Sequence, residues 1–144
     1  MINLIQGQIN IGEAIIKVTS RSEELDVLAD RGLIEKRENP GDLRYHLESE
    51  ADRLRFAVSI SVRDDRIEWL LLRWLDSPMK SWDDVTKQLV TDEYRLLSSF
   101  VKRQVGARAD SKRFRTRTWH VKWGKIDVNC NEHEFSVSIC MMPK

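Results

Sequence analysis

The chain lacks several features that would place it quickly in a functional class. It has 144 residues but only two cysteines and six glycines, and the glycines are scattered singly. A glycine-rich phosphate loop is therefore absent from the sequence, and so is the second pair of cysteine or histidine ligands that a structural zinc site needs. The nucleophile elbow Gly-x-Ser-x-Gly does not occur either. These absences predict a protein that is not an enzyme and that holds no metal and no cofactor.

Long apolar runs and an excess of one charge are also missing. No apolar run approaches the roughly 18 residues of a membrane-spanning helix. The first ten residues, MINLIQGQIN, lack the basic and then apolar regions of a signal peptide. The formal net charge is +1, so no overall field attracts the protein to nucleic acid or to a membrane. We therefore expect a cytoplasmic protein without a membrane partner, in which Cys130 and Cys140 are reduced core thiols.

What the sequence does contain is typical of a globular protein. Charged residues make up 33% of the chain and apolar residues 41%. A length of 144 residues corresponds to one domain that buries a core without disulfides. We predict a single α+β domain over residues 1–144.

The first half of the chain predicts a short N-terminal helix and several strands. Ser20 and Glu23 have the spacing of a capping box, and Gly32 is a suitable end for the helix that follows. The sequence Asn39-Pro40-Gly41-Asp42 predicts a hairpin turn. Apolar residues alternate strictly from Leu54 to Val62, which is typical of a strand with one buried face. Residues 67–75 are apolar on both faces and predict a central strand that is covered on each side or offers one face to a partner.

The second half predicts a long helix and then further strands. Ser81 is the expected N-cap, and Gly106 the expected end, of an amphipathic helix. Its apolar stripe consists of Val85, Leu89, Leu96, Phe100 and Val101. Strands are predicted over residues 118–121, 125–130 and 134–141, with a turn at 131–133. The predicted fold is α+β, a meandering antiparallel sheet with one long amphipathic helix packed on it and the short N-terminal helix beside it.

One part of the chain has a strong charge asymmetry. We call residues 102–125 the basic segment, because it contains nine Lys or Arg residues and one acid, Asp110. It carries a net charge of +8, which leaves −7 on the rest of the chain. Interleaved aromatic residues give it the composition of a surface for an acidic partner or for nucleic acid, and the alternative is a mobile, solvated loop. The candidate binding residues are Arg113, Arg115, Arg117, Trp119, Trp123 and, on the doubly apolar strand, Trp69.

Several short motifs resemble those of a protein group. They are Ser81-Trp82-Asp83-Asp84, Glu93, the helix end at Gly106 and Trp123-Gly124 before the last hairpin. In these motifs the chain resembles a loose group of small, largely uncharacterised bacterial α+β proteins, some of which are immunity or accessory proteins of secreted toxin systems. The chain departs from the group in its longer basic insertion, Arg108 to Arg117, and in Asn129-Cys130-Asn131, where the group has an acidic turn. The resemblance implies binding to a toxin or to a secretion component.

Two classes of function follow from the sequence. The first is a non-enzymatic protein-binding module whose partner has an acidic surface. The second is a small-ligand-binding protein or enzyme with a pocket lined by Trp69, Trp74 or Trp82. Weak nucleic-acid binding through residues 102–125 is less favoured, because the sequence has no recognised RNA-binding motif. The sequence leaves the oligomeric state open.

Overall fold

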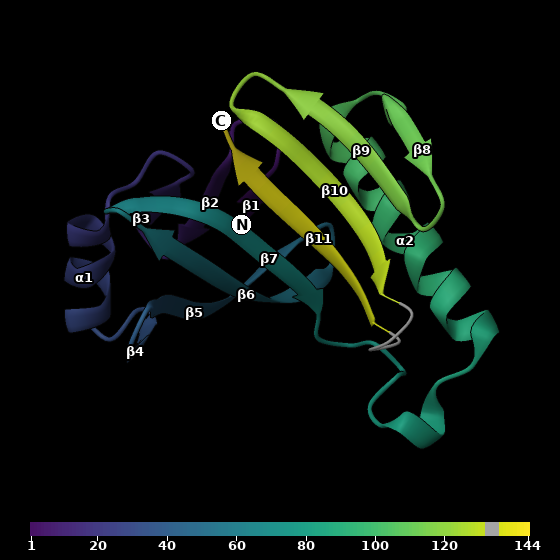
Figure 1. Cartoon of the computed structure of the whole chain (residues 1–144), viewed down its shortest axis with the longest axis horizontal. Helices are drawn as coiled ribbons and strands as arrows, with labels where there is room; N and C mark the ends of the chain where they lie inside the picture. The colour runs from purple at the N-terminus through teal and green to yellow at the C-terminus, as the bar shows by residue number, and fades with distance from the viewer. Residues whose placement is uncertain (132–135) are drawn as a thin grey trace.

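The computed structural model describes residues 1–131 and 136–144, which form two α-helices, a short 3-10 helix and two antiparallel sheets (Figure 1). The large sheet consists of two four-stranded meanders that join where β7 pairs with β11. The first meander contains β4 (Glu35–Asn39), β5 (Asp42–Ala51), β6 (Leu54–Arg63) and β7 (Arg66–Trp74). The second contains β8 (Ser111–Arg113), β9 (Thr116–Val121), β10 (Gly124–Asn131) and β11 (Ser136–Pro143).

The sequence patterns explain the first meander. The alternation from Leu54 to Val62 is confirmed as β6, in which Phe56, Val58 and Ile60 are buried. The hairpin predicted around Pro40 and Gly41 is confirmed as β4 and β5, which pair from Asn39 and Asp42 onward. A large antiparallel sheet is therefore present, as the period-two patterns predict.

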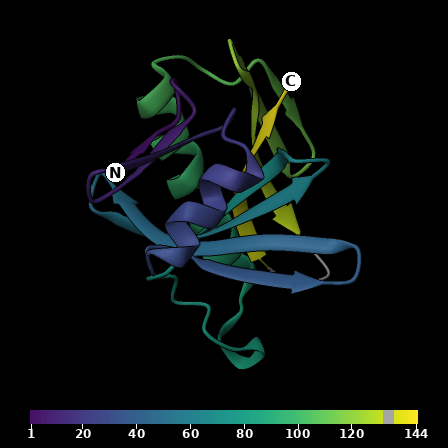
Figure 2. The ribbon, with the colours of Figure 1, turned by 90° about the vertical axis from the view of Figure 1, so that its left-hand side faces the viewer.

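Both α-helices and the small sheet of residues 1–131 lie on one face of the large sheet, which we call the covered face. Its side chains include Tyr45, Phe56 and Ile60. The helix α2 (Lys87–Val105) packs there, with the ring of Phe100 centred 5.3 Å from that of Phe56. The helix α1 (Ser22–Asp30) lies on the same side, and so does the small sheet. The small sheet consists of β1 (Ile2–Asn3), β2 (Gln8–Ile11) and β3 (Ala14–Lys17). Figure 2 shows this arrangement with α1 nearest the viewer.

The opposite face, which we call the open face, has no described helix over it. The prediction that the strand over residues 67–75 is covered on both sides is therefore wrong within the described residues. Leu70 and Leu72 of β7 are buried in the core, whereas Trp69 and Leu71 are only half-buried on the open face. The strand is central, between β6 and β11, and its second apolar face is the one that the fold leaves accessible.

Both helices begin later than the caps predict. Three strands precede α1, so it is not the first element, and its N-cap is Arg21 rather than Ser20, whose hydroxyl instead accepts a hydrogen bond from the N–H of Lys17 at 2.9 Å. The helix α2 is capped by Thr86, whose hydroxyl accepts from the N–H of Leu89 at 3.1 Å. Residues 82–84 form the separate 3-10 helix η1 (Trp82–Asp84), and the Trp82 side chain is 67% exposed.

The two cysteines point away from each other. Cys130 lies opposite Val137 on the covered face, and Cys140 lies opposite Asp127 on the open face. Side chains on opposite faces of a sheet cannot form a disulfide bond with each other, because their Cβ vectors diverge. Burial raises the pKa of Cys130, and burial together with the nearby Asp127 carboxylate raises the pKa of Cys140 to about 11. The turn predicted at 131–133 falls partly outside the described residues.

Candidate functional site

The central part of the basic segment, residues 111–121, forms the β8–β9 hairpin rather than a loop. Gly106 ends α2 in the left-handed conformation, with φ 79°, which glycine adopts without strain. The N–H of Asp110 then donates to the carbonyl of Thr118 at 2.8 Å, and the Asp110 carboxylate accepts from the N–H of His120 at 2.6 Å. These bonds hold the chain beside β9, so that β8 and β9 form the edge of the large sheet. The only acid of the basic segment is therefore engaged with the backbone.

Most of the cations in the basic segment are not neutralised. Lys125 pairs with Asp127 at 3.8 Å, and the guanidinium of Arg117 lies 5.0 Å from the ring centre of Tyr94. Six further cations are exposed and make no ion pair with a described residue; they are Lys102, Arg103, Arg108, Lys112, Arg113 and Lys122. The charge excess that the sequence predicts is therefore concentrated at one edge of the sheet and at the end of α2.

The tip of the β8–β9 hairpin combines an exposed aromatic ring with a fixed backbone. Phe114 and Arg115 form the turn, and Phe114 is 81% exposed. Arg115 has φ 64°, and its carbonyl accepts from the N–H of Cys130 at 2.9 Å. The hydroxyl of Thr116 donates to the side-chain oxygen of Asn129 at 3.0 Å. Both bonds attach the tip to β10, so the turn that carries Phe114 is fixed by the neighbouring strand.

The three candidate tryptophans do not lie on one surface. Trp119 is 2% exposed, and its indole N–H donates to the carbonyl of Ala107 at 3.0 Å. The indole N–H of Trp123 donates to the carbonyl of Leu4 at 2.9 Å. Both rings therefore belong to the packing of the fold. Trp69 lies on the open face, where the guanidinium of Arg44 is 5.2 Å from its ring centre.

The three candidate arginines point in different directions. Arg113 points to the open face, since it lies opposite Thr116, and Arg117 lies on the covered face against α2. Arg115 is in the turn between them, with its guanidinium 4.6 Å from the ring centre of Phe114. Arg113 and Arg115 thus meet at the hairpin tip beside Phe114. Phe114 was not a candidate residue, and the pattern Arg113-Phe114-Arg115 is the signal that could have indicated it, although its exposure follows only from the structure.

The open face differs from the basic segment because its charges are largely paired. Arg44 pairs with Asp42 at 3.0 Å, and Arg55 pairs with Asp76 at 2.6 Å. Half-buried apolar side chains lie between these pairs, namely Trp69, Leu71 and Met142. This face could meet another protein, but its charges select no particular partner.

A serine and a histidine meet on the open face. The hydroxyl of Ser59 lies 3.0 Å from Nδ1 of His46. Burial and the neighbouring Arg37 guanidinium lower the pKa of His46, so the ring is neutral near pH 7. The backbone N–H groups around the pair belong to the β5–β6 and β6–β7 ladders, so they are not free to stabilise an oxyanion. The contact is best explained as cross-strand packing.

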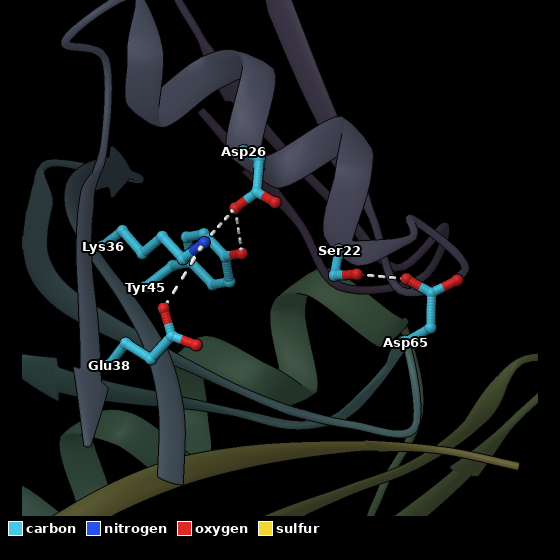
Figure 3. A network of polar contacts seen from close by, with 6 residues as sticks. All are labelled: Ser22, Asp26, Lys36, Glu38, Tyr45 and Asp65. Atoms are coloured by element: carbon cyan, nitrogen blue, oxygen red, sulfur yellow. Dashed lines mark hydrogen bonds and ion pairs between the residues drawn. The ribbon is translucent and has the colours of Figure 1, made fainter. Parts of the chain in front are cut away.

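A second polar cluster attaches α1 to the sheet. Asp26 accepts hydrogen bonds from the Tyr45 hydroxyl at 2.6 Å and from Lys36 at 2.9 Å, and Ser22 donates to Asp65 (Figure 3). The bond from Tyr45 and then that from Lys36 lower the pKa of Asp26. These carboxylates already have partners within the fold. Among the described residues, no group of three or more His, Cys, Asp or Glu side chains is arranged to hold a metal ion.

The structure does not bring together the three tryptophans that were considered for a pocket. Trp69 lies on the open face and Trp74 on the covered face, opposite Phe56 in the neighbouring strand. Trp82 lies on the connection before α2 and is mostly exposed. The three side chains therefore do not line one cavity.

Comparison with known proteins gives no assignment: no family model matches the chain, and neither a curated protein nor a solved structure is significantly similar to it. The helices within residues 1–131 and 136–144 are too short or too polar to cross a membrane.

Proposed function

We propose that the protein is a non-enzymatic protein-binding module that uses the basic segment to bind an acidic surface of its partner. The observation that carries the proposal is the group of six exposed cations, at the sheet edge and the end of α2, that make no ion pair within the part of the chain that the structure describes. Unpaired charges at one edge attract an oppositely charged partner over roughly the Debye length, about 8 Å at physiological ionic strength. The paired charges of the open face lack this property.

A protein partner explains the surface better than nucleic acid does. Binding to single strands uses aromatic rings on which bases stack, and here the rings of Trp119 and Trp123 are engaged in the fold. Only Phe114 of the aromatic residues in the basic segment is strongly exposed. The net charge of +1 also gives a long polyanion little overall attraction.

A more specific form of the proposal is an immunity or accessory protein in the cytoplasm that binds a bacterial toxin or secretion component. This form rests on the resemblance at Ser81 to Asp84, Glu93 and Trp123-Gly124. A basic surface on such a protein would cover an acidic part of the toxin and block access to it.

The test compares two variants of equal net charge. One replaces Arg108, Lys112 and Arg113 with Ser, and its control replaces Lys17, Arg31 and Lys87, exposed cations outside the basic segment, with Ser. Each protein is immobilised, partners are captured from the source cells, and association rates are measured at two salt concentrations. We expect the first variant to associate roughly tenfold more slowly at low salt and to lose most of the salt dependence. Equal rates for the two variants would contradict the proposal.

A further inference from the structure

Phe114 is exposed in a way that the fold does not require. The other described phenylalanines, Phe56 and Phe100, are fully buried in the core. Phe114 lies at the hairpin tip, 81% exposed, with Lys112 and Arg113 before it and Arg115 after it. A single exposed apolar residue is common on protein surfaces, so exposure alone says little. The arrangement around this ring is what distinguishes it.

Two hydrogen bonds fix the turn that carries the ring, and one side chain contacts the ring itself. The carbonyl of Arg115 is bonded to the N–H of Cys130, and Thr116 is bonded to Asn129. The Arg115 guanidinium lies 4.6 Å from the ring centre of Phe114. A side chain on a fixed turn loses less conformational entropy on binding than one on a mobile loop. Aromatic rings and arginines of this kind are the residues that most often dominate a protein interface.

We propose that Phe114 is the anchor of the interface, and that the partner is a protein with an apolar pocket whose rim carries carboxylates. This inference rests on the proposed function, since it assigns the partner of the same basic segment. Lys112 and Arg113 lie on opposite faces of β8, so cations flank the ring on both sides of the strand. Carboxylates around the whole rim of the pocket would meet them.

Trp82 is the other strongly exposed aromatic residue with neighbouring charges. Its neighbours Asp83 and Asp84 are acidic and exposed. An acidic rim would repel the carboxylates of Asp83 and Asp84. The same partner surface would therefore bind Phe114 and not Trp82.

The first test uses a small host molecule as the probe. A carboxylate-rimmed pillararene has an apolar cavity with carboxylates at both openings, and its hydroxyl-rimmed analogue has the same cavity without charge. The four phenylalanines of the protein are labelled with 4-fluorophenylalanine, and the Phe114→Leu variant assigns the Phe114 signal. We expect the carboxylate host to shift the Phe114 fluorine signal and to leave the signals of Phe56 and Phe100 unchanged. We expect the neutral host to bind at least roughly tenfold more weakly.

The variants separate this inference from the proposed function. Phe114→Ser should weaken binding of the carboxylate host roughly tenfold or more without changing its salt dependence, and Phe114→Leu should restore part of the affinity. Lys112→Ser with Arg113→Ser should weaken binding mainly at low salt. Host binding that depends on Lys112 and Arg113 but not on Phe114 would overturn the anchor and leave the basic surface intact. No binding of the carboxylate host at about 50 mM salt would overturn both.

A single-stranded DNA oligonucleotide is the competing probe. If it shifts the Phe114 signal at physiological salt while the carboxylate host does not, the partner is a nucleic acid and the inference is wrong. If the host shifts the signal and the oligonucleotide does not, the pocket chemistry is supported. Melting temperatures of all variants should equal that of the unmodified protein, because Phe114, Lys112 and Arg113 are exposed.

Discussion

Glu93 is a buried carboxyl group on α2, outside the basic segment. It is 5% exposed and accepts a hydrogen bond from the hydroxyl of Ser77, at the start of the connection that leads to η1. Burial raises the pKa of Glu93 above its ordinary value, in opposition to the Ser77 hydrogen bond and to Lys80. One hydroxyl donor therefore does not fully replace the water that an ionised carboxylate loses on burial.

Replacing Glu93 with Gln tests this cost. Because the folded-state pKa is above the unfolded value, the contribution of Glu93 to stability is fully present below about pH 4.5 and is lost as the pH rises through the folded pKa. Glutamine is neutral at every pH and still accepts the hydrogen bond from Ser77. We expect the melting temperature of Glu93→Gln to exceed that of the unmodified protein at about pH 7, and the difference to disappear near pH 4. A melting temperature that differs from that of the unmodified protein by the same amount at both pH values would contradict the raised pKa of Glu93.

Single residues also show where prediction from the sequence fails. Ser20 and Ser81 have good capping patterns, yet neither is the N-cap of an α-helix. The Ser20 hydroxyl closes a turn with Lys17, and the Ser81 hydroxyl donates to Asp84. Local hydrogen bonds of this kind compete with capping, and their energies are too similar for the sequence to decide between them. The error moves the helix boundaries by a few residues and leaves the helices themselves in place.

At the level of elements, strands with alternating apolar residues are predictable and edge strands are not. The patterns at β6 and β11 identify strands because one face of each is buried. The strand β8 has only three residues, Ser111, Lys112 and Arg113, and its composition indicates a loop. Charged residues on a short edge strand prevent pairing with another chain. The same charged composition removes the apolar alternation by which a strand is recognised in the sequence, so β8 was not predicted. Every residue of β4, at the other edge, is exposed as well.

Two side chains form hydrogen bonds between the N-terminal segment and the rest of the molecule, in addition to the core packing of Ile2, Leu4, Ile9 and Ile16. Gln104 of α2 accepts from the N–H of Leu4 and donates to the carbonyl of Ile2, and Trp123 donates to the carbonyl of Leu4. The Trp123 ring also packs on Gly7, where a Cβ would lie 3.0 Å from the ring. Any side chain at Gly7 would collide with the indole, and its φ of 65° also favours glycine.

Removing one of these bonds should loosen the small sheet. In Trp123→Phe the carbonyl of Leu4 loses its donor, which costs about 1–3 kcal/mol where the group is shielded from water. We expect faster hydrogen exchange of the amides that pair β2 with β3, and unchanged exchange in β6 and β7. Trp69→Phe is the matched control, since the same substitution on the open face removes no hydrogen bond within the described residues. Equal exchange in the two variants would mean that the Trp123 hydrogen bond does not stabilise the small sheet.

The whole molecule has an asymmetry that its net charge conceals. The basic segment carries +8 and the rest of the chain −7, and the cations lie around β8, β9 and the end of α2. The sequence was sufficient to identify this charge excess. It could not identify the exposed Phe114 or the buried Trp119, because whether a side chain lies on the open or the covered face depends on strand register and on which face the helices cover. The candidate surface was therefore predictable in its charge and not in its contacts.

Charge clustering should be measurable without any partner. The sequence pI is 7.8, so at about pH 8.5 the net charge of the protein is slightly negative. A cation exchanger responds to local charge within about a Debye length, and we expect it to retain the unmodified protein at this pH and low salt through the basic segment. The variant with Ser at Arg108, Lys112 and Arg113 should elute at clearly lower salt than the control with Ser at Lys17, Arg31 and Lys87, although their net charges are equal. Circular dichroism should show the same fold for all three proteins, because these side chains are exposed and contribute little to folding.

Elution of the two variants at the same salt concentration would mean that the cations of the basic segment do not bind the exchanger together. That result would contradict the electrostatic basis of the proposed function.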